Sequence, residues 1–114
     1  MAAMNETRIS QFRKGVVELA ILALLDAGEL YGVEIVDTLG KDPALAISAG
    51  TVYPLLSRLK KGGLIDSVWR ESPVGPPRKY YKLTKRGETE LKMMAEEWSG
   101  VVESIQRLLE ANGS

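Results

Sequence analysis

The segment GTVYPLLSRLKKGGLI, residues 50–65, has the pattern of a short amphipathic helix followed by a helix stop. Its apolar residues recur every three or four positions, at Val52, Leu55, Leu56 and Leu59. A helix between Ser48 and Lys61 turns these side chains to one side, and Gly62-Gly63 ends it. The opposite side is small at its start and basic at its end.

The first turn of this helix is open to two readings, because Pro54 has no N–H to donate. If Thr51 is the N-cap, Pro54 lies in the first turn, where that donor has no partner anyway. If Ser48 is the N-cap, the helix loses one hydrogen bond. Either start gives an unusual first turn.

Two further helices precede this segment. Residues 11–27 contain a nearly continuous apolar run, which predicts a helix buried on most sides and ended by Gly28. Residues 31–39 form an amphipathic helix ended by Gly40. Gly32 in that helix permits the close approach of a neighbour.

A β-hairpin and a long helix follow. Residues 64–71 and 78–83 are rich in β-branched and aromatic residues, which predicts two strands. The breaker cluster between them, residues 72–77 (SPVGPP), forms a stiff tip. Thr84 is the expected cap of the last helix. That helix carries an apolar stripe in a/d spacing, made of Leu91, Met94, Trp98, Val101, Ile105 and Leu108.

The order of helix, helix, helix, hairpin and helix predicts a winged helix-turn-helix, a mainly α fold with a small β-hairpin. We expect a flexible N-terminal tail at residues 1–8, the winged helix-turn-helix over residues 9–84, and a C-terminal dimerisation helix over residues 85–114. In this architecture the third helix enters the major groove of DNA, and the hairpin reaches phosphate or the minor groove. Double-stranded DNA is therefore the expected partner.

The candidate DNA contacts lie on the outward side of the third helix and on the hairpin. Small residues let the backbone approach the base edges, and Arg58 has the fork that suits guanine. For the hairpin tyrosines, half-buried packing in the sheet is the alternative. The candidate set is Ser48, Gly50, Thr51, Tyr53, Pro54, Ser57, Arg58, Lys61, Arg78, Lys79 and Tyr81.

The charge of the chain cancels in total but not along the sequence. Residues 58–86 hold nine bases and two acids, a local net charge of +7, while the formal net charge of the whole chain is zero. The remainder therefore carries −7. This asymmetry favours a basic working surface joined to acidic elements that face elsewhere, although a lone charge run is often only a solvated face.

The chain has no cysteine and no histidine, and its carboxylates are spread over helical faces. These features exclude disulfides, the usual zinc sites and any histidine general base. We therefore expect no enzyme, no metal and no cofactor. The run at residues 16–25 has nine apolar residues in ten, too few to span a bilayer. We expect a cytoplasmic protein with no membrane partner.

Three stretches of the sequence resemble the PadR-type transcriptional regulators. They are residues 28–35 (GELYGVEI), residues 50–59 (GTVYPLLSRL) with the glycine and apolar pair at 63–65, and residues 75–84 (GPPRKYYKLT). The resemblance is to the short form with one C-terminal helix, and it implies a dimeric repressor that a small molecule releases from DNA. Val33, where the family usually has an aromatic residue, and the long loop 40–47 depart from that pattern.

The apolar stripe of the last helix predicts a homodimer. So small a domain cannot bury the whole stripe, and burial of each large side chain stabilises by roughly 1.5–3 kcal/mol. The alternative is packing within one chain only. A two-fold dimer sets its recognition helices about 34 Å apart on successive major grooves, so a pseudo-palindromic operator is expected.

By the family resemblance, Trp98 is the candidate effector-binding residue. In some members a tryptophan at this place lines a cavity between protomers and stacks on flat aromatic ligands. Met94 and Phe12 are further candidates for the same wall, and a packed interfacial tryptophan without ligand is the alternative.

Two other functions are also compatible with this sequence. A winged helix also serves as a protein-interaction adaptor that never touches DNA, and a DNA-coating protein binds without sequence preference. The basic wing distinguishes the first from a regulator, because neutralising Arg78 and Lys79 should flatten the salt dependence of DNA binding.

Overall fold

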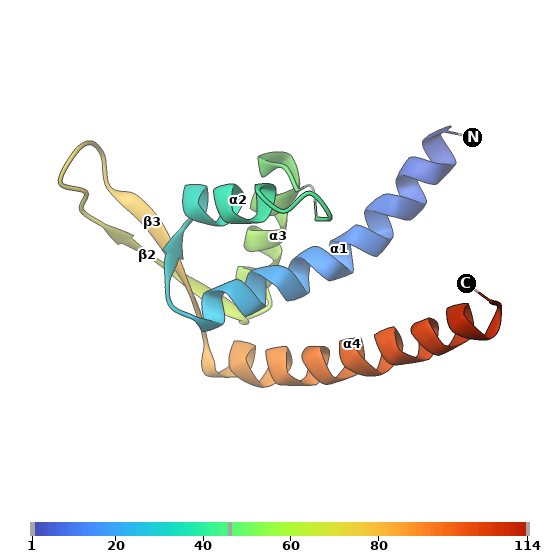
Figure 1. Ribbon diagram of the computed structural model, residues 1–114. Helices are drawn as coiled ribbons and strands as arrows, with labels where there is room; N and C mark the ends of the chain where they lie inside the picture. Colours follow the sequence, from blue (N-terminus) through green and yellow to red (C-terminus); the bar gives the residue numbers. More distant parts are fainter. Residues whose placement is uncertain (1, 46, 114) are drawn as a thin grey trace.

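The computed structural model describes residues 2–45 and 47–113, with side chains described from residue 13 onward. The elements in chain order are α1 (Ala2–Asp26), β1 (Leu30–Tyr31), α2 (Gly32–Gly40), α3 (Ala49–Lys61), β2 (Ile65–Arg70), β3 (Arg78–Leu83) and α4 (Lys85–Ala111). The predicted fold class is confirmed: the chain is mainly helical and has a small antiparallel sheet (Figure 1).

The sheet has three strands in the order β1-β3-β2, one more than the sequence predicts. β1 is only two residues long and pairs antiparallel with β3, with Leu30 opposite Tyr81 and Tyr31 opposite Tyr80. Two residues are too few to show the alternation of a strand. The helix expected from position 31 therefore begins one residue later, with the Tyr31 N–H donating to the Glu34 carboxylate.

The core lies between α1, α2, α3 and the inner face of the sheet. Its most completely buried side chains are Val17, Ile21, Leu22, Ile35, Val52, Leu56 and Ile65. Two glycines with positive φ follow helix ends: Gly28 (φ 147°) lies after α1 and Gly63 (φ 78°) lies after α3. Both turns were predicted, because glycine adopts such backbone angles at no steric cost.

α1 starts at Ala2, whereas the sequence indicated a helix from residue 11 and a flexible tail at residues 1–8. The helical backbone of residues 2–8 differs from that expectation. Good helix formers such as Ala, Met, Glu and Arg make up most of this segment, and neither Pro nor Gly interrupts it. A helix that the core already holds at residues 17–25 extends through such a segment without an apolar period of its own.

α3 starts at Ala49 with Ser48 as its N-cap, which decides between the two predicted starts. The N–H groups of Thr51 and Val52 both donate to the Ser48 carbonyl oxygen, at 3.0 and 3.1 Å. Pro54 consequently lies inside the helix, where it has no N–H to give to the Gly50 carbonyl. Ile47, buried at the end of the preceding loop, holds this start against the core.

α4 begins as predicted, with Thr84 as its N-cap. The Thr84 hydroxyl accepts from the Gly87 N–H at 3.0 Å and donates to the Gly63 carbonyl at 2.6 Å. Figure 1 shows the far halves of α1 and α4 projecting on the side opposite the β2–β3 hairpin, and the molecule is 56 Å long as a result. Among the described residues, no helix is long and apolar enough to cross a membrane.

Candidate nucleic-acid interface

α3 presents a narrow outward ridge. Its core side chains are Val52, Leu55, Leu56 and Leu59. Directly opposite them, at spacings of four, three and four residues, lie Gly50, Pro54, Ser57 and Lys61, all exposed. The ridge is therefore small over most of its length and ends in a lysine, so a groove can approach the backbone of the helix closely.

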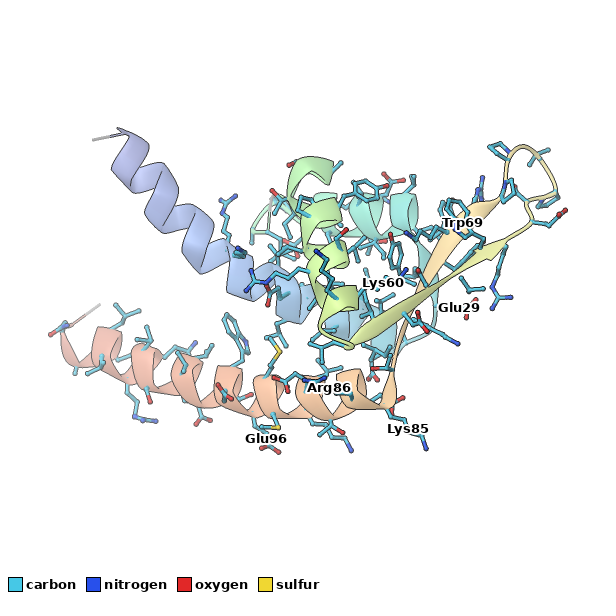
Figure 2. The ribbon with its side chains drawn as sticks, turned by 180° about the vertical axis from the view of Figure 1, so that it is seen from behind. Glu29, Lys60, Trp69, Lys85, Arg86 and Glu96 are labelled. Atoms are coloured by element: carbon cyan, nitrogen blue, oxygen red, sulfur yellow. The ribbon has the colours of Figure 1, made fainter. Side chains whose placement is uncertain are left out.

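The two flanks of this ridge face different parts of the molecule. Tyr53 and Lys60 lie on the flank toward the hairpin, and Lys60 projects from that side in Figure 2. The Tyr53 ring packs on Gly32, the first residue of α2, which confirms the close approach predicted for that glycine. Ser48 and Thr51 are exposed at the start of the helix.

Arg58 lies on the opposite flank, toward α1. Its Nη1 is 3.6 Å from Oε1 of Glu18, and its side chain is 59% exposed. Both residues line an open cleft of about 330 Å³ between α3 and the start of α4. An ion pair at this distance is weak in water, but it draws the guanidinium away from the central ridge on which a guanine contact was expected.

The β2–β3 hairpin, the wing, separates its basic residues onto two faces. Side chains alternate along a strand, and the register places Trp69 opposite Lys79 and Arg70 opposite Arg78. Lys79 and Tyr81 lie on the face turned toward the helices. Arg78 and Tyr80 lie on the outer face.

Lys79 borders a depression that joins the wing to the helices. This depression, of about 230 Å³, is lined by Tyr31, Gly32, Val33, Tyr53, Trp69, Arg78, Lys79 and Tyr81. Lys79 Nζ is 5.9 Å from the Trp69 ring centroid and 5.8 Å from that of Tyr81. The lysine charge thus lies beside the flank of α3 that carries Tyr53, over aromatic faces that attract a cation.

Tyr81 was predicted to contact DNA at the surface, but the structure buries its side chain. Its side chain is 8% exposed and belongs to the core. Burial, and to a smaller extent the neighbouring Tyr53, raises the pKa of its phenol. The packing alternative is the one observed, because position 81 faces the helices.

Arg78 is exposed, but its guanidinium lies over the Tyr31 ring, 4.4 Å from the centroid. The Tyr31 and Tyr80 rings meet edge to face at 5.5 Å. Arg78 and Lys79 are adjacent in the sequence, but their charged groups lie near different aromatic rings.

The apolar stripe of α4 divides into two parts. Leu91 and Met94 pack against the core of their own chain. Trp98, Val101, Ile105 and Leu108 are exposed, with 43% of the Trp98 side chain accessible. In Figure 2 the labelled Glu96 points away from the rest of the molecule, so α4 presents a carboxylate on that side.

The three candidate effector residues have different surroundings. Trp98 is on the surface of the single chain and Met94 is partly buried. The Phe12 side chain lies outside the described residues. An enclosed cavity around Trp98 would need a second chain to close it.

Two residues of the candidate interface were not predicted from the sequence. Trp69 is 66% exposed on the wing beside Lys79, and Tyr31 supplies the ring under Arg78. The hairpin register would have placed Trp69 opposite Lys79 once the tip was taken as residues 71–77. No local signal reveals Tyr31, because β1 becomes a strand only by pairing with β3.

The chain was compared with protein families and solved structures. The model described as "Transcriptional regulator PadR-like family" matches residues 21–93, more than half of the chain. A PadR-like transcription factor from Bacteroides fragilis is 41% identical with a TM-score of 0.75, over 90% of this chain and 98% of that one.

Two further solved structures are similar to this chain. A PadR-like transcriptional regulator from Bacillus cereus is 37% identical with a TM-score of 0.78, over 87% of this chain and 96% of that one. PadR of Bacillus subtilis, solved in complex with operator DNA, is 30% identical with a TM-score of 0.61. That match covers 68% of this chain and 45% of the longer relative.

Proposed function

The chain belongs to the PadR-like family of transcriptional regulators, and from this premise we propose that it represses transcription by binding a pseudo-palindromic DNA operator as a homodimer. Family membership confirms the predicted resemblance and the expectation that the protein is a regulator and not an enzyme. A relative at 30% identity was solved with its operator. As a regulator of transcription it would act in the cytoplasm.

The observation that carries the proposal is the composition of the α3 ridge. Gly50, Pro54 and Ser57 expose no long side chain, and Lys61 follows at the end. In the proposed complex the ridge lies in the major groove, with hydroxyls and the backbone near base edges and the lysine on phosphate. Ser48, Thr51, Tyr53 and Arg58 flank the ridge.

The wing supplies the second contact in this proposal. Lys79 stands on the same side as Tyr53, across the depression between α3 and the wing. A phosphate that passes from the recognition helix toward the wing would meet this lysine as a point charge. Its expected contribution is the release of about one counterion.

The homodimer is supported by the exposed half of the α4 stripe. Four large apolar residues, Trp98, Val101, Ile105 and Leu108, lie on one side of a helix that projects beyond the core. A second copy can bury them all at once in a two-fold contact, since the same stripe meets itself. The two recognition helices would then address successive major grooves.

Relief of repression by a flat, apolar small molecule is the further part of the proposal. Trp98 would provide the stacking surface once a partner encloses it, with Met94 and Phe12 as neighbours. Such a ligand must favour a dimer whose recognition helices no longer fit the groove spacing, because equal affinity for both states shifts nothing.

Fluorescence anisotropy with labelled duplexes tests the DNA-binding function. The purified protein is titrated with the duplex upstream of its own gene and with a scrambled duplex, each at several salt concentrations. We expect tighter binding to the natural duplex. Log K falls as log salt rises, and the magnitude of this negative slope should decrease by about one unit for Lys61→Ala and for Lys79→Ala.

Lys92→Ala is the matched control, since Lys92 is exposed one helical turn before Glu96 on the outer face of α4. It should leave affinity and slope unchanged. Equal affinity for both duplexes would indicate a DNA-coating protein. Absence of binding at low salt would indicate the adaptor.

A further inference from the structure

Two arginines face each other across the wing. Arg70 on β2 and Arg78 on β3 are direct partners in the register and lie on the outer face of the hairpin. Like charges directly opposite each other destabilise a strand pair. Each guanidinium must therefore find its own compensating partner, and the two partners differ.

The compensating groups form a continuous ladder on the outer face. Arg70 Nε donates to Glu29 Oε1 at 2.6 Å, and its guanidinium lies 5.9 Å from the Tyr80 ring centroid. Arg78 lies over the Tyr31 ring at 4.4 Å. Because the two rings meet edge to face at 5.5 Å, the ladder runs from Glu29 to Arg78 without interruption.

This ladder ties the wing to β1. The hairpin projects from the body of the molecule (Figure 1), and β1 pairs with β3 through only two residues, both at or below Tyr80. Arg70 and Arg78 form the last pair of the ladder before the turn at residues 71–77. The stack of Arg78 on Tyr31 and the hydrogen bond from Arg70 to Glu29 are thus the two outermost described links between the wing and the rest of the domain.

Lys79, next along the strand, points to the other face. Both bases line the depression beside Tyr53, but the Lys79 ammonium lies near the Trp69 and Tyr81 rings, whereas one face of the Arg78 guanidinium lies on the Tyr31 ring. A planar guanidinium stacks well on an aromatic face, and an ammonium serves as a point charge for phosphate.

We propose that Arg78 is a positioning residue of the DNA-binding surface: it holds the wing against Tyr31 so that Lys79 meets the phosphate, and it binds no phosphate itself. This inference rests on the proposed function and divides the roles of two adjacent bases. It makes the loss of Arg78 a geometric defect, whereas the loss of Lys79 removes a charge contact.

The salt dependence of DNA binding separates these roles. Arg78→Ala and Tyr31→Leu should each weaken operator binding several-fold with the slope of the wild type. Lys79→Ala should decrease the magnitude of the slope by about one unit. The double variant Arg78→Ala/Tyr31→Leu should bind as the single variants do, because both remove one contact. Tyr31→Phe, which keeps the ring face, should bind like the wild type.

A second measurement uses the free protein. Amide hydrogen exchange across residues 70–78 should accelerate in Arg78→Ala and Tyr31→Leu. Lys82→Ala is the control, since Lys82 shares the outer face but lies at the base of the wing, and it should exchange like the wild type.

A slope reduced by about one unit in Arg78→Ala would overturn the inference, because it would identify a phosphate contact. If the wild type bound no DNA, the proposed function would fail. The exchange measurement would still decide the positioning role, and unchanged exchange in Arg78→Ala would reject it.

Discussion

The Tyr53 ring occupies the space that a side chain at position 32 would need. A Cβ built on Gly32 would lie 2.9 Å from Tyr53 Cε1 and 3.1 Å from its hydroxyl oxygen. This contact joins the first residue of α2 to the outward flank of α3. Since Tyr53 is 42% exposed, its ring can move, and we expect the contact to affect the shape of the proposed DNA-binding surface more than the stability of the fold.

Gly32→Ala should therefore impair DNA binding while leaving the fold nearly intact. The added methyl displaces a mobile ring, so we expect the free energy of unfolding to change by less than about 1 kcal/mol. Affinity for the operator should fall as far as it does in Tyr53→Ala. The double variant should be no weaker than either single one, and additive losses in a binding titration would contradict this coupling.

Gly87→Ala should damage the fold itself. A Cβ at this position would overlap the Leu64 carbonyl oxygen, which belongs to the backbone and cannot move alone. We expect a loss of roughly 1–3 kcal/mol or more in denaturant unfolding. Gly100→Ala is the matched control in the same helix, because nothing lies within 4 Å of its Cβ. It should stabilise by about 0.5–1 kcal/mol, and equal effects at both sites would refute the packing argument.

Thr84→Ala should lower the melting temperature. The hydroxyl accepts from the Gly87 N–H and donates to the Gly63 carbonyl, so one substitution removes the cap of α4 and its link to the end of α3. We expect a loss of about 1–2 kcal/mol. Thr84→Ser keeps both hydrogen bonds and should behave nearly like the wild type at the same protein concentration.

The buried Tyr81 phenol should make the protein sensitive to alkali. Burial raises its pKa above the ordinary value of 10.0, so the folded state holds the proton more tightly than the unfolded chain. This stabilising contribution is complete below about pH 10 and is lost as the pH rises through the raised pKa. Unfolding in urea should show a smaller alkaline loss for Tyr81→Phe than for the wild type. Identical pH profiles would argue against the buried phenol as the cause.

Ile105→Glu should shift the chain toward monomer, because it places a carboxylate in the proposed dimer contact. Sedimentation equilibrium measures the change, and operator affinity should fall with it. Ser99→Glu introduces the same charge on the other side of α4, outside the stripe, and should leave the assembly state unchanged. A wild-type chain that sediments as a monomer at micromolar concentration would remove the basis of this expectation.

Elements with a strong local signal were predicted well. The residues of α3 that point inward, the stop at Gly63 and the cap at Thr84 all follow from periodicity and capping chemistry. The start of α1 and the strand β1 were missed for opposite reasons. Residues 2–8 have helix propensity but no apolar period, and β1 has no pattern of its own because its partner lies some 50 residues away.

The candidate site shows the same division. The exposed ridge of α3 was predictable, because a helix that buries four residues on one side must expose those on the other. The surroundings of Arg58, Arg78 and Tyr81 could not be predicted from the sequence. Arg58 turns toward Glu18 on α1, and Arg78 turns toward Tyr31 on β1. Each partner is distant in sequence, so no local pattern indicates it.

By itself the sequence determined the order of the elements, the inward side of each helix and the concentration of positive charge in residues 58–86. Those properties follow from backbone geometry and side-chain period, which act within a few residues. The tertiary structure alone decided the surroundings of each of these bases. It placed Arg78 over Tyr31 and Lys79 near Trp69 and Tyr81, because adjacent side chains of a strand point to opposite faces, and only the folded chain brings a different neighbour to each face.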